Sequence, residues 1–600
     1  MLYAADFENT IDNMYSTYVW SAGICNVKTK EYEVFENIDD FIEYIKLNVE
    51  EKSTIYFHNL NYDINFLLAY LNKNYYEEVP SNKRGWIDFN CGYNIIATIE
   101  GVFYQLTVQF DTGKQVRFRD SLKLVNSSLE KMGKDLGIPE EVQKLTGTID
   151  YGKHREEGYH MTDVERQYQI NDVLALAYCI EKMEEMGLTE CMTAAAFAMR
   201  QYKKILYLQD HKGASEKQKG FARSVREYFE RVFPVLDDEV DKFIRSSYRG
   251  GFCYCNADSE KIYKQDLYVY DVNSMYPAQM FGVTDGTNTY GGKFPVGEPH
   301  WFNSLNELPE GIMYFVRLNA WFEVKDGYIP FIQLKNNRMF QENEYVKDSE
   351  GYQEITLTKQ DYELFLKHYN IIDMEVIGGY WFYTRDNLFT DYINKFYAMK
   401  DEGKRTGNKT KTALAKICLN SLYGKFGTRG NRPVAHVEYD DKNILHISAH
   451  RDANGVLDEL EGDTIYIPVA STVTAYARKY IVSSAQENYD NFLYSDTDSL
   501  HLSAPAKGIW VDKYELGAWD LESTPTIGRY VRQKTYIEYI DGEWDLKACG
   551  MPQQCKELAI EKYGDDIVNV FGKGFEVEGK LSRKRVSGGV ILFGTTFTIK

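Results

Sequence analysis

Residues 491–502 read NFLYSDTDSLHL, and two aspartates of this stretch, Asp496 and Asp498, flank a single threonine. Apolar residues on both sides of the aspartates predict two strands joined by a tight turn. A third aspartate, Asp271, ends the apolar strand of DLYVYDVNSMYP at residues 266–277. The chemistry of turns explains each aspartate equally well by itself. Together they indicate a carboxylate cluster suited to divalent metal ions.

A helix between these two stretches adds a cation and an aromatic ring. Residues 416–425 read KICLNSLYGK, in which Lys416, Asn420 and Tyr423 fall near one helix face. Such side chains suit a triphosphate and a base. A lysine on a helix is usually exposed to solvent, so the pattern has little weight alone.

Acidic residues near the N-terminus form a second group. Asp6 and Glu8 stand two apart on a predicted strand, so both side chains leave one face while Phe7 points to the opposite, buried face. The chain has 89 acidic residues, so one such pair is expected by chance. The pair therefore needs support from elsewhere in the chain.

Two later motifs supply that support. YFHNLNYDINF at residues 56–66 runs from a strand into a helix and carries Asp63. YQIND at residues 168–172 puts Tyr168 and Asp172 on one helix face, although an amphipathic helix with polar residues outward explains this motif too. As a set, four carboxylates and a tyrosine suit phosphodiester hydrolysis with two metal ions.

The composition is that of a large globular chain. With 600 residues, 44% of them apolar, it can bury several cores, and about three to five domains are expected. A net charge of −20 neither supports nor excludes a nucleic-acid partner, because a local basic groove is sufficient for binding. The nine cysteines lack zinc-site spacing, and no basic leader or long apolar run is present. We therefore expect a cytoplasmic protein without a membrane segment.

Seven motifs in order resemble one family, the protein-primed family B DNA polymerases of the bacteriophage phi-29 type. The three exonuclease motifs of that family are matched by Asp6 with Glu8, by Asp63, and by Tyr168 with Asp172. The four polymerase motifs are matched by DVNSMYP, KICLNSLYGK, YSDTDS and RQKTY. The likeness runs from YAADFENT near the N-terminus to the final TTFTIK.

The resemblance implies a multidomain α/β and α+β fold, in which an RNase H-like 3′-5′ exonuclease domain precedes a right-hand polymerase with palm, fingers and thumb. About 145 residues separate Asp271 from Lys416 and about 72 separate Gly424 from Asp496, which indicates two insertions. The expected domains are the exonuclease domain at 1–187, the first part of the palm at 188–281, an insertion resembling terminal-protein region 1 at 282–386, the fingers at 387–426, an insertion resembling terminal-protein region 2 at 427–463, the second part of the palm at 464–545 and the thumb at 546–600.

By the same resemblance, both acidic groups hold metal ions. Asp271, Asp498 and the carbonyl of Val272 are expected to bind the ions of the polymerase site, with Asp496 as a supporting carboxylate. Two Mg²⁺ ions per site are implied, and Mn²⁺ can replace them. Tyr168 is expected to be catalytic in the exonuclease site, whose expected metal ligands are Asp6, Glu8, Asp63 and Asp172.

The resemblance also implies contacts with substrates. Tyr276 is expected to be the steric gate that excludes a 2′-hydroxyl, and Tyr423 is expected to pack against the incoming base pair. Lys416 with Lys400 would clamp the triphosphate. The expected contacts with a frayed single-stranded 3′ end are His58, Asn59, Phe66, Ser121 and Leu122. The expected contacts with template and primer are Tyr248, Gly250, Gly251, Asn420, Ser421, Gly424, Lys534 and Tyr536.

The implied protein is a DNA-directed DNA polymerase with a proofreading exonuclease, acting as a monomer on primer-template DNA and deoxynucleoside triphosphates. In the family, a terminal protein supplies the priming hydroxyl, and the insertions encircle DNA for processive strand displacement on a linear phage-type genome. One alternative is a family B polymerase that extends RNA or DNA primers. Others are a catalytically inactive DNA-binding replication factor and an exonuclease whose C-terminal half only clamps DNA.

The sequence departs from the family at KLTGTIDY, residues 144–151. The family has a lysine directly before the glycine, where this chain has Thr146. Lys144, two residues earlier, would face the same side of a strand. We expect weaker exonuclease activity unless Lys144 reaches the site. Met275 in place of the usual leucine conserves volume and should have little effect.

Overall fold

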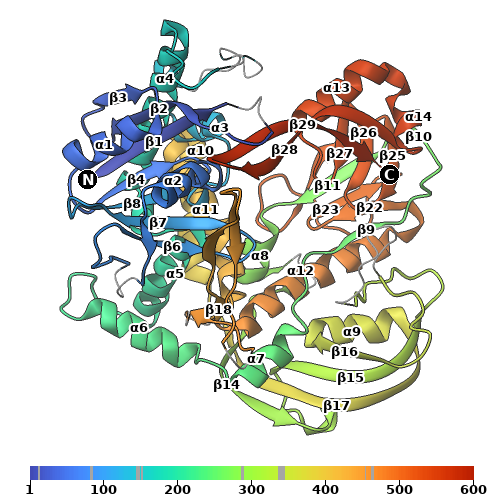
Figure 1. The fold of residues 1–600 in the computed structure, drawn as a ribbon. Helices are drawn as coiled ribbons and strands as arrows, with labels where there is room; N and C mark the ends of the chain where they lie inside the picture. Colours follow the sequence, from blue (N-terminus) through green and yellow to red (C-terminus); the bar gives the residue numbers. More distant parts are fainter. Residues whose placement is uncertain are drawn as a thin grey trace.

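The computed structural model shows an N-terminal domain beside a larger C-terminal part, whose last hairpin reaches back to the N-terminal domain (Figure 1). None of the helices in the described part of the chain has the length and apolar character needed to cross a bilayer. The structure describes residues 1–599 except 11–13, 81–84, 144–148, 150–152, 154, 285–288, 335–344, 453–454, 461 and 463–464.

An eight-stranded mixed sheet, in the order β3-β2-β1-β4-β8-β7-β6-β5, is the centre of the N-terminal domain. Phe7 of β1 enters the core on one face, where its ring packs edge-on against Phe41 and Phe57. Helix α4 covers the opposite face of β1 and β2. The strands are β1 (Leu2–Asn9), β2 (Val19–Asn26), β3 (Tyr32–Phe35), β4 (Ser53–Phe57), β5 (Glu77–Glu78), β6 (Gly92–Ala97), β7 (Phe103–Gln109) and β8 (Gln115–Asp120), and the helices are α1 (Ile38–Asn48), α2 (Leu60–Lys73), α3 (Leu129–Leu136) and α4 (Asp163–Glu185).

Helix α4 begins at a capping box in which Thr162 and Glu165 each accept a hydrogen bond from the other's backbone N–H. Arg155 and Tyr159 also donate to the Glu165 carboxylate, at 2.8 and 2.7 Å. Burial raises the pKa of Glu165, but these hydrogen bonds outweigh it and lower the pKa to about 2. The ionised carboxylate therefore fixes the start of the helix that carries Asp172.

Glu165→Gln should lower the free energy of unfolding by roughly 1–3 kcal/mol near neutral pH, because it replaces a buried charged acceptor. The folded-state pKa lies below the ordinary value of 4.5, so this stabilisation is present above about pH 4.5 and is lost as the pH falls toward 2. Denaturant unfolding of both proteins across this range measures the difference. If the difference in unfolding free energy between the two proteins did not become smaller in acid, the stabilising role of the ionised Glu165 carboxylate would be contradicted.

A five-stranded antiparallel sheet, in the order β24-β11-β23-β22-β9, lies in the two segments predicted as the palm. The strand–turn–strand predicted for residues 491–502 is confirmed by β22 and β23, and helix α12 packs against both strands. A second sheet, in the order β10-β25-β26-β27, lies beside the first. The elements are α5 (Ala194–Asp210), α6 (Phe221–Val232), α7 (Asp238–Arg245), β9 (Cys253–Cys255), β10 (Tyr263–Lys264), β11 (Tyr268–Val272), α8 (Met275–Phe281), α12 (Ile467–Glu487), β22 (Phe492–Asp496), β23 (Ser499–Leu502), β24 (Trp519–Ser523), β25 (Ile527–Arg532), β26 (Thr535–Ile540) and β27 (Glu543–Ala548).

The region predicted as the first insertion has its own four-stranded sheet, in the order β14-β17-β15-β16 (Figure 1). Helix α9 lies against this sheet and also against α12 of the palm, so it joins the two layers. The elements are β14 (Lys293–Phe302), β15 (Met313–Val324), β16 (Gln353–Thr358), α9 (Lys359–His368) and β17 (Tyr369–Asp386).

Two antiparallel helices, α10 (Thr390–Thr406) and α11 (Lys409–Phe426), make up the region predicted as the fingers, and α11 contains the helix predicted at residues 416–425. α11 packs against α5 and α12 of the palm. The hydroxyl of Thr410 donates to the carbonyl of Leu136 at the end of α3, at 2.9 Å, so this pair of helices also touches the N-terminal domain.

The second predicted insertion and the thumb both contact the N-terminal domain. Ala435 and Leu445 of the insertion are buried within the hydrophobic core of that domain. At the thumb tip, the carbonyl of Ser587 accepts from the backbone N–H of Thr17 at 2.9 Å. The insertion contains β18 (Arg432–Pro433), β19 (His436–Tyr439), β20 (Leu445–Ser448) and β21 (Glu459–Leu460), and the thumb contains α13 (Gln553–Tyr563), α14 (Ile567–Phe571), β28 (Phe575–Val586) and β29 (Gly589–Ile599).

Candidate active sites at two carboxylate clusters

Three aspartates meet at one end of the palm sheet because of the way its strands pair. Asp271 lies on β11, which pairs antiparallel with β23, and the N–H of Val272 donates to the carbonyl of Asp498 at 2.9 Å. Thr497 has a φ of 63°, a left-handed conformation that lets the turn between β22 and β23 close. Asp496 and Asp498 leave this turn on either side of Thr497, and the pairing brings Asp271 beside Asp498.

Burial and the charges of neighbouring carboxylates raise the pKa of two of these carboxyl groups. Desolvation, and then the charges of Asp498, Glu522 and Asp520, raise the pKa of Asp271 to about 7. Desolvation raises the pKa of Asp498 to about 6, with further increases from Asp496 and Glu522. Oxygen donors that repel one another in a half-buried site are the ligand set that Mg²⁺ prefers. The residues therefore fit a divalent ion.

The acidic residues of β24 were missed by the sequence reasoning. Asp520 lies opposite Asp271 in the β11–β24 pair, and Glu522 follows it on the same strand. The alternation of acidic and apolar residues in WDLES at residues 519–523 is the one signal that could have drawn attention to them.

Asp496 is held differently from the other two aspartates. The ammonium group of Lys534 donates to both of its carboxylate oxygens at 2.8 Å. The backbone N–H of Lys534 donates to the hydroxyl of Tyr494 at 2.9 Å, which fixes the lysine relative to β22. A carboxylate already paired with a cation suits a supporting role, and the role predicted for Asp496 stays a prediction.

The predicted nucleotide-binding residues come together beside this cluster. The rings of Tyr276 and Tyr423 stack with centroids 4.1 Å apart and planes 24° apart. The ammonium group of Lys400 donates to the Ser274 hydroxyl at 3.0 Å. Burial, and then the charges of Lys404 and Lys416, lower the pKa of Lys400. An aromatic platform beside mutually repelling lysines suits a base and a triphosphate.

The SYRGG segment at residues 247–251 runs directly against the turn that carries Asp496 and Asp498. A Cβ atom on Gly251 would lie 2.9 Å from the Thr497 Cγ2 atom, so only glycine fits there without movement. A Cβ atom on Gly250 would meet nothing within 4 Å, and this residue is exposed. The Tyr248 ring lies against Gly427 at the end of the fingers helix α11.

The structure also brings the N-terminal carboxylates together. One ligand oxygen each of Asp6, Glu8 and Asp172 lie within 4.8 Å of one another, an arrangement that could hold a metal ion. Asp63 of α2 is fully buried, and its pKa is raised well above the ordinary value by desolvation and then by the charge of Asp6. Three elements, β1, α2 and α4, thus supply the predicted ligand set.

Gln169 was not predicted, although it lies inside the YQIND motif. Its side-chain amide donates to the carbonyl of Asp6 at 3.1 Å and accepts from the Ser21 hydroxyl at 2.9 Å. Gln169 therefore fixes α4 against β1 and β2, and with it the position of Asp172. Asp120, at the end of β8, accepts from the N–H of Asn59 at 3.0 Å and was missed as well.

The residues predicted to grip a single-stranded 3′ end surround the start of α2. His58 Nδ1 lies 3.0 Å from the hydroxyl of Ser121, and the N–H of Leu122 donates to Asp120 at 3.0 Å. Asn59 has a left-handed φ of 73°. Phe66, however, is 2% exposed and lies against the thumb residue Gly589. Its ring has to become exposed before it can stack on a base as predicted.

Tyr168 is 3% exposed and packs with Trp20 and Ile149. Thr146, which stands where the family has a lysine, and Lys144, which was predicted as its possible substitute, lie outside the described residues. Asn420 and Gly424, which were predicted to contact template and primer, are exposed on α11, with Ser421 partly exposed between them. Tyr536 is partly buried and packs against Tyr494 at 4.8 Å between ring centroids.

A nuclease-like sheet with a carboxylate cluster, followed by palm, fingers and thumb around a second cluster, defines a DNA polymerase of the right-hand class. The model of the family "DNA polymerase type B, organellar and viral" matches residues 46–146 and 138–508. The chain belongs to this family of DNA polymerases. The family and fold class predicted from the motifs are thereby confirmed.

Named relatives match along the whole chain. The DNA polymerase of Streptococcus phage Cp-1 is 34% identical over 626 residues, covering 100% of this chain and 98% of its own length. The DNA polymerase of Bacillus phage phi29 is 31% identical over 644 residues, covering 100% and 99%. A structure of the phi29 enzyme with primer-template DNA and incoming nucleotide substrates is 30% identical, with a TM-score of 0.83 and full coverage of both chains.

Proposed function

We propose that this DNA polymerase extends a primer on a DNA template at the palm cluster and removes mispaired 3′ ends at the N-terminal cluster. The observation that carries the proposal is the presence of two separate carboxylate sites, each assembled from several elements. The phi29 polymerase, with the same fold, has been solved with primer-template DNA and nucleotides, which supports DNA and deoxynucleoside triphosphates as substrates.

In the palm, Asp271, Asp498 and the Val272 carbonyl would hold divalent ions. When bound, two such ions supply positive charge that neutralises the transferring phosphoryl oxygens and lowers the pKa of the attacking hydroxyl. Lys400 and Lys416 stabilise the triphosphate, and the stacked rings of Tyr276 and Tyr423 support the sugar and base.

In the N-terminal domain, Asp6, Glu8, Asp63 and Asp172 would hold the ions for hydrolysis of the terminal phosphodiester. Raised pKa values are typical of buried carboxylates that lie close together, as in a cation site, and the pKa of Asp63 is raised by burial and by the charge of Asp6. The hydroxyl of Tyr168 would orient the attacking water. His58, Asn59 and Leu122 lie around the start of α2 and would hold an unpaired strand.

The two activities should separate in a labelled primer-template assay with magnesium. Asp498→Ala should reduce extension by several orders of magnitude and spare degradation, because it removes a metal ligand from one site only. Asp6→Ala should do the reverse. In the same assay, Lys144→Ala should slow degradation if this lysine serves the exonuclease site. Extension by the Asp498→Ala enzyme, or degradation by the Asp6→Ala enzyme at the wild-type rate, would refute the corresponding site.

We further propose that the insertion at 427–463 and the thumb enclose the DNA and so allow processive strand displacement. The support is the contact of both elements with the N-terminal domain at neighbouring points. Arg585 of the thumb donates to Asn65 of α2 at 3.1 Å. A Cβ atom on Gly101 would lie 3.1 Å from Arg585 and 3.8 Å from Ile447 of the insertion, so three parts of the chain meet there.

Arg585→Ala should shorten the product made in one binding event. Loss of this charged hydrogen bond would cost about 1–2 kcal/mol. It would raise the population of molecules in which the thumb has separated from the N-terminal domain roughly five- to thirtyfold. Extension on primed single-stranded circles with a trap for released enzyme measures product length. Lys580→Ala is the matched control, since this thumb lysine lies over Phe597 within the same hairpin. Equal product lengths for Arg585→Ala and the wild type would show that the contact of Arg585 with the N-terminal domain does not keep the DNA enclosed.

Priming by a terminal protein is the part of the proposal that rests on family membership and on the presence of both insertions. Transfer of a labelled deoxynucleotide to a hydroxyl of a partner protein would establish it. Extension of oligonucleotide primers alone would instead favour an enzyme that uses ordinary RNA or DNA primers.

A further inference from the structure

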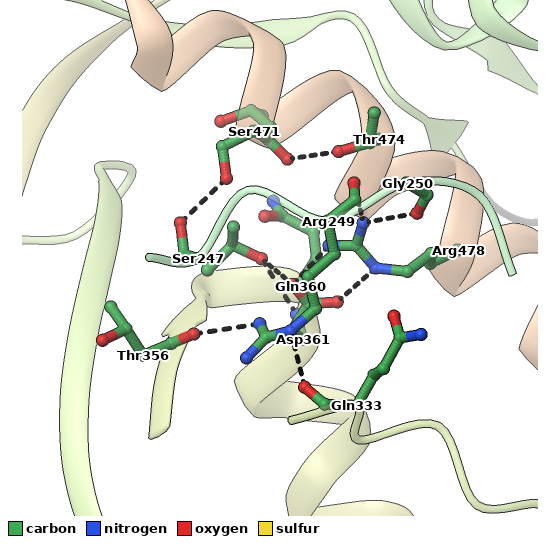
Figure 2. A network of polar contacts seen from close by, with 12 residues as sticks. Ser247, Arg249, Gly250, Gln333, Thr356, Gln360, Asp361, Ser471, Thr474 and Arg478 are labelled. Atoms are coloured by element: carbon green, nitrogen blue, oxygen red, sulfur yellow. Dashed lines mark hydrogen bonds and ion pairs between the residues drawn. The ribbon is translucent and has the colours of Figure 1, made fainter. Parts of the chain in front are cut away.

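A buried arginine, Arg478 of α12, connects three separate parts of the chain behind the palm site. Its guanidinium Nη2 and Nε atoms donate to the two carboxylate oxygens of Asp361 on α9, at 2.6 and 3.1 Å (Figure 2). The side chains of Arg478 and Asp361 are 3% and 2% exposed. This fork-like pairing fixes the plane of the guanidinium group.

The third nitrogen of the same group holds the SYRGG segment. Arg478 Nη1 donates to the carbonyl of Arg249 at 2.8 Å and to the carbonyl of Gly250 at 3.0 Å (Figure 2). Two turns earlier on the same face of α12, Ser471 shares a 2.8 Å hydrogen bond with Ser247. The segment therefore lies along one face of α12 and is fixed at both of its ends.

The first insertion fixes the segment from the other side. Arg249 donates from Nε to the carbonyl of Gln333 at 3.2 Å and from Nη1 to the carbonyl of Thr356 at 3.0 Å. Asp361 is itself held by Thr358, the N-cap residue of α9, whose hydroxyl accepts from the Asp361 N–H at 3.1 Å. The anchor of Arg478 is thus part of the insertion and not of the palm.

The direction of the Arg249 and Gly250 carbonyl groups determines where the N–H groups of the same two peptides point. Every described peptide bond is trans, and across a trans peptide the carbonyl and the following N–H point in opposite directions. Because both carbonyls point inward to Arg478, the N–H groups of Gly250 and Gly251 point away from it. In the described part of the chain, neither N–H has a hydrogen-bond acceptor. Gly250 is also exposed, with open space around it.

We propose that Arg478 is a positioning residue that turns the N–H groups of Gly250 and Gly251 toward a template phosphate, and that Asp361 of the insertion sets its orientation. This rests on the proposed function, in which the SYRGG segment contacts the template. Two backbone N–H groups that point the same way can donate to one phosphate, and glycine lets a phosphate approach the backbone closely. The insertion thereby influences how the SYRGG segment binds the template, through the buried ion pair between Asp361 and Arg478.

The test measures binding of primer-template DNA in which single template phosphates near the primer end are replaced by uncharged methylphosphonates. The wild type should lose affinity at one phosphate. Arg478→Lys keeps the charge beside Asp361 but cannot make the paired guanidinium hydrogen bonds, so it should bind the unmodified DNA about tenfold or more weakly. Replacing that one phosphate should then cause no further loss of its affinity. Equal further losses for both proteins would overturn the proposal.

Two additional variants separate positioning from folding. Removing one partner alone would leave an unpaired buried charge, so Arg478→Gln is combined with Asp361→Asn. This double variant should lose affinity for primer-template DNA while its KM for deoxynucleotides and its degradation of single-stranded DNA stay at wild-type values. A parallel loss of degradation would show a merely structural role and overturn the proposal.

The matched control is Lys479→Ala, because Lys479 joins the same two helices through Glu363, at 2.5 Å, on the exposed side. It should bind the DNA as the wild type does. An equal loss in this control would overturn the assignment, since any link between α12 and α9 would then suffice. Failure of the wild type itself to extend primers would refute the proposed function, which distinguishes that outcome from failure of the positioning role.

Discussion

The antiparallel pairing of β11 with β23 is the constraint on which the polymerase site depends. The hydrogen bond from the Val272 N–H to the Asp498 carbonyl sets the register, and this register puts Asp271 beside Asp498 although 226 residues of sequence lie between them. A slip of one residue would turn Asp271 to the other face of the sheet. Burial is the main reason why the pKa values of Asp271 and Asp498 are raised, and the neighbouring carboxylates that the pairing brings close raise them further.

The same physical principle governs the carboxylate site of the N-terminal domain. Its carboxylates come from β1, α2 and α4, and hydrogen bonds between elements bring them together. Gln169 ties α4 to Asp6 and Ser21, and the capping box at Glu165 fixes where α4 begins. Both sites therefore consist of charged groups that repel one another and are held in place by neutral or oppositely charged neighbours. Such an arrangement stores electrostatic energy that a bound cation relieves.

Local pattern alone could predict a considerable part of this molecule. The turn at Asp496 and Asp498, the strand ending at Asp271, and the helix at residues 416–425 all follow from periodicity and turn chemistry. Gln169, Asp120 and Glu522 were missed because their importance comes from partners distant in sequence. The burial of Phe66 beneath Gly589 could not be predicted either, since the thumb that covers it lies more than 500 residues further along the chain.

The sequence by itself determined which residues carry charge and which short segments form strands, turns and helices, because these depend on neighbours within a few positions. It also determined the family, because the motifs occur in a fixed order. Only the tertiary structure decided that α9 of the insertion reaches α12, and that Asp361, Arg478 and the SYRGG carbonyls meet in one buried network. The physical reason is that ion pairs and backbone hydrogen bonds between distant segments exist only after their sheets and helices have packed.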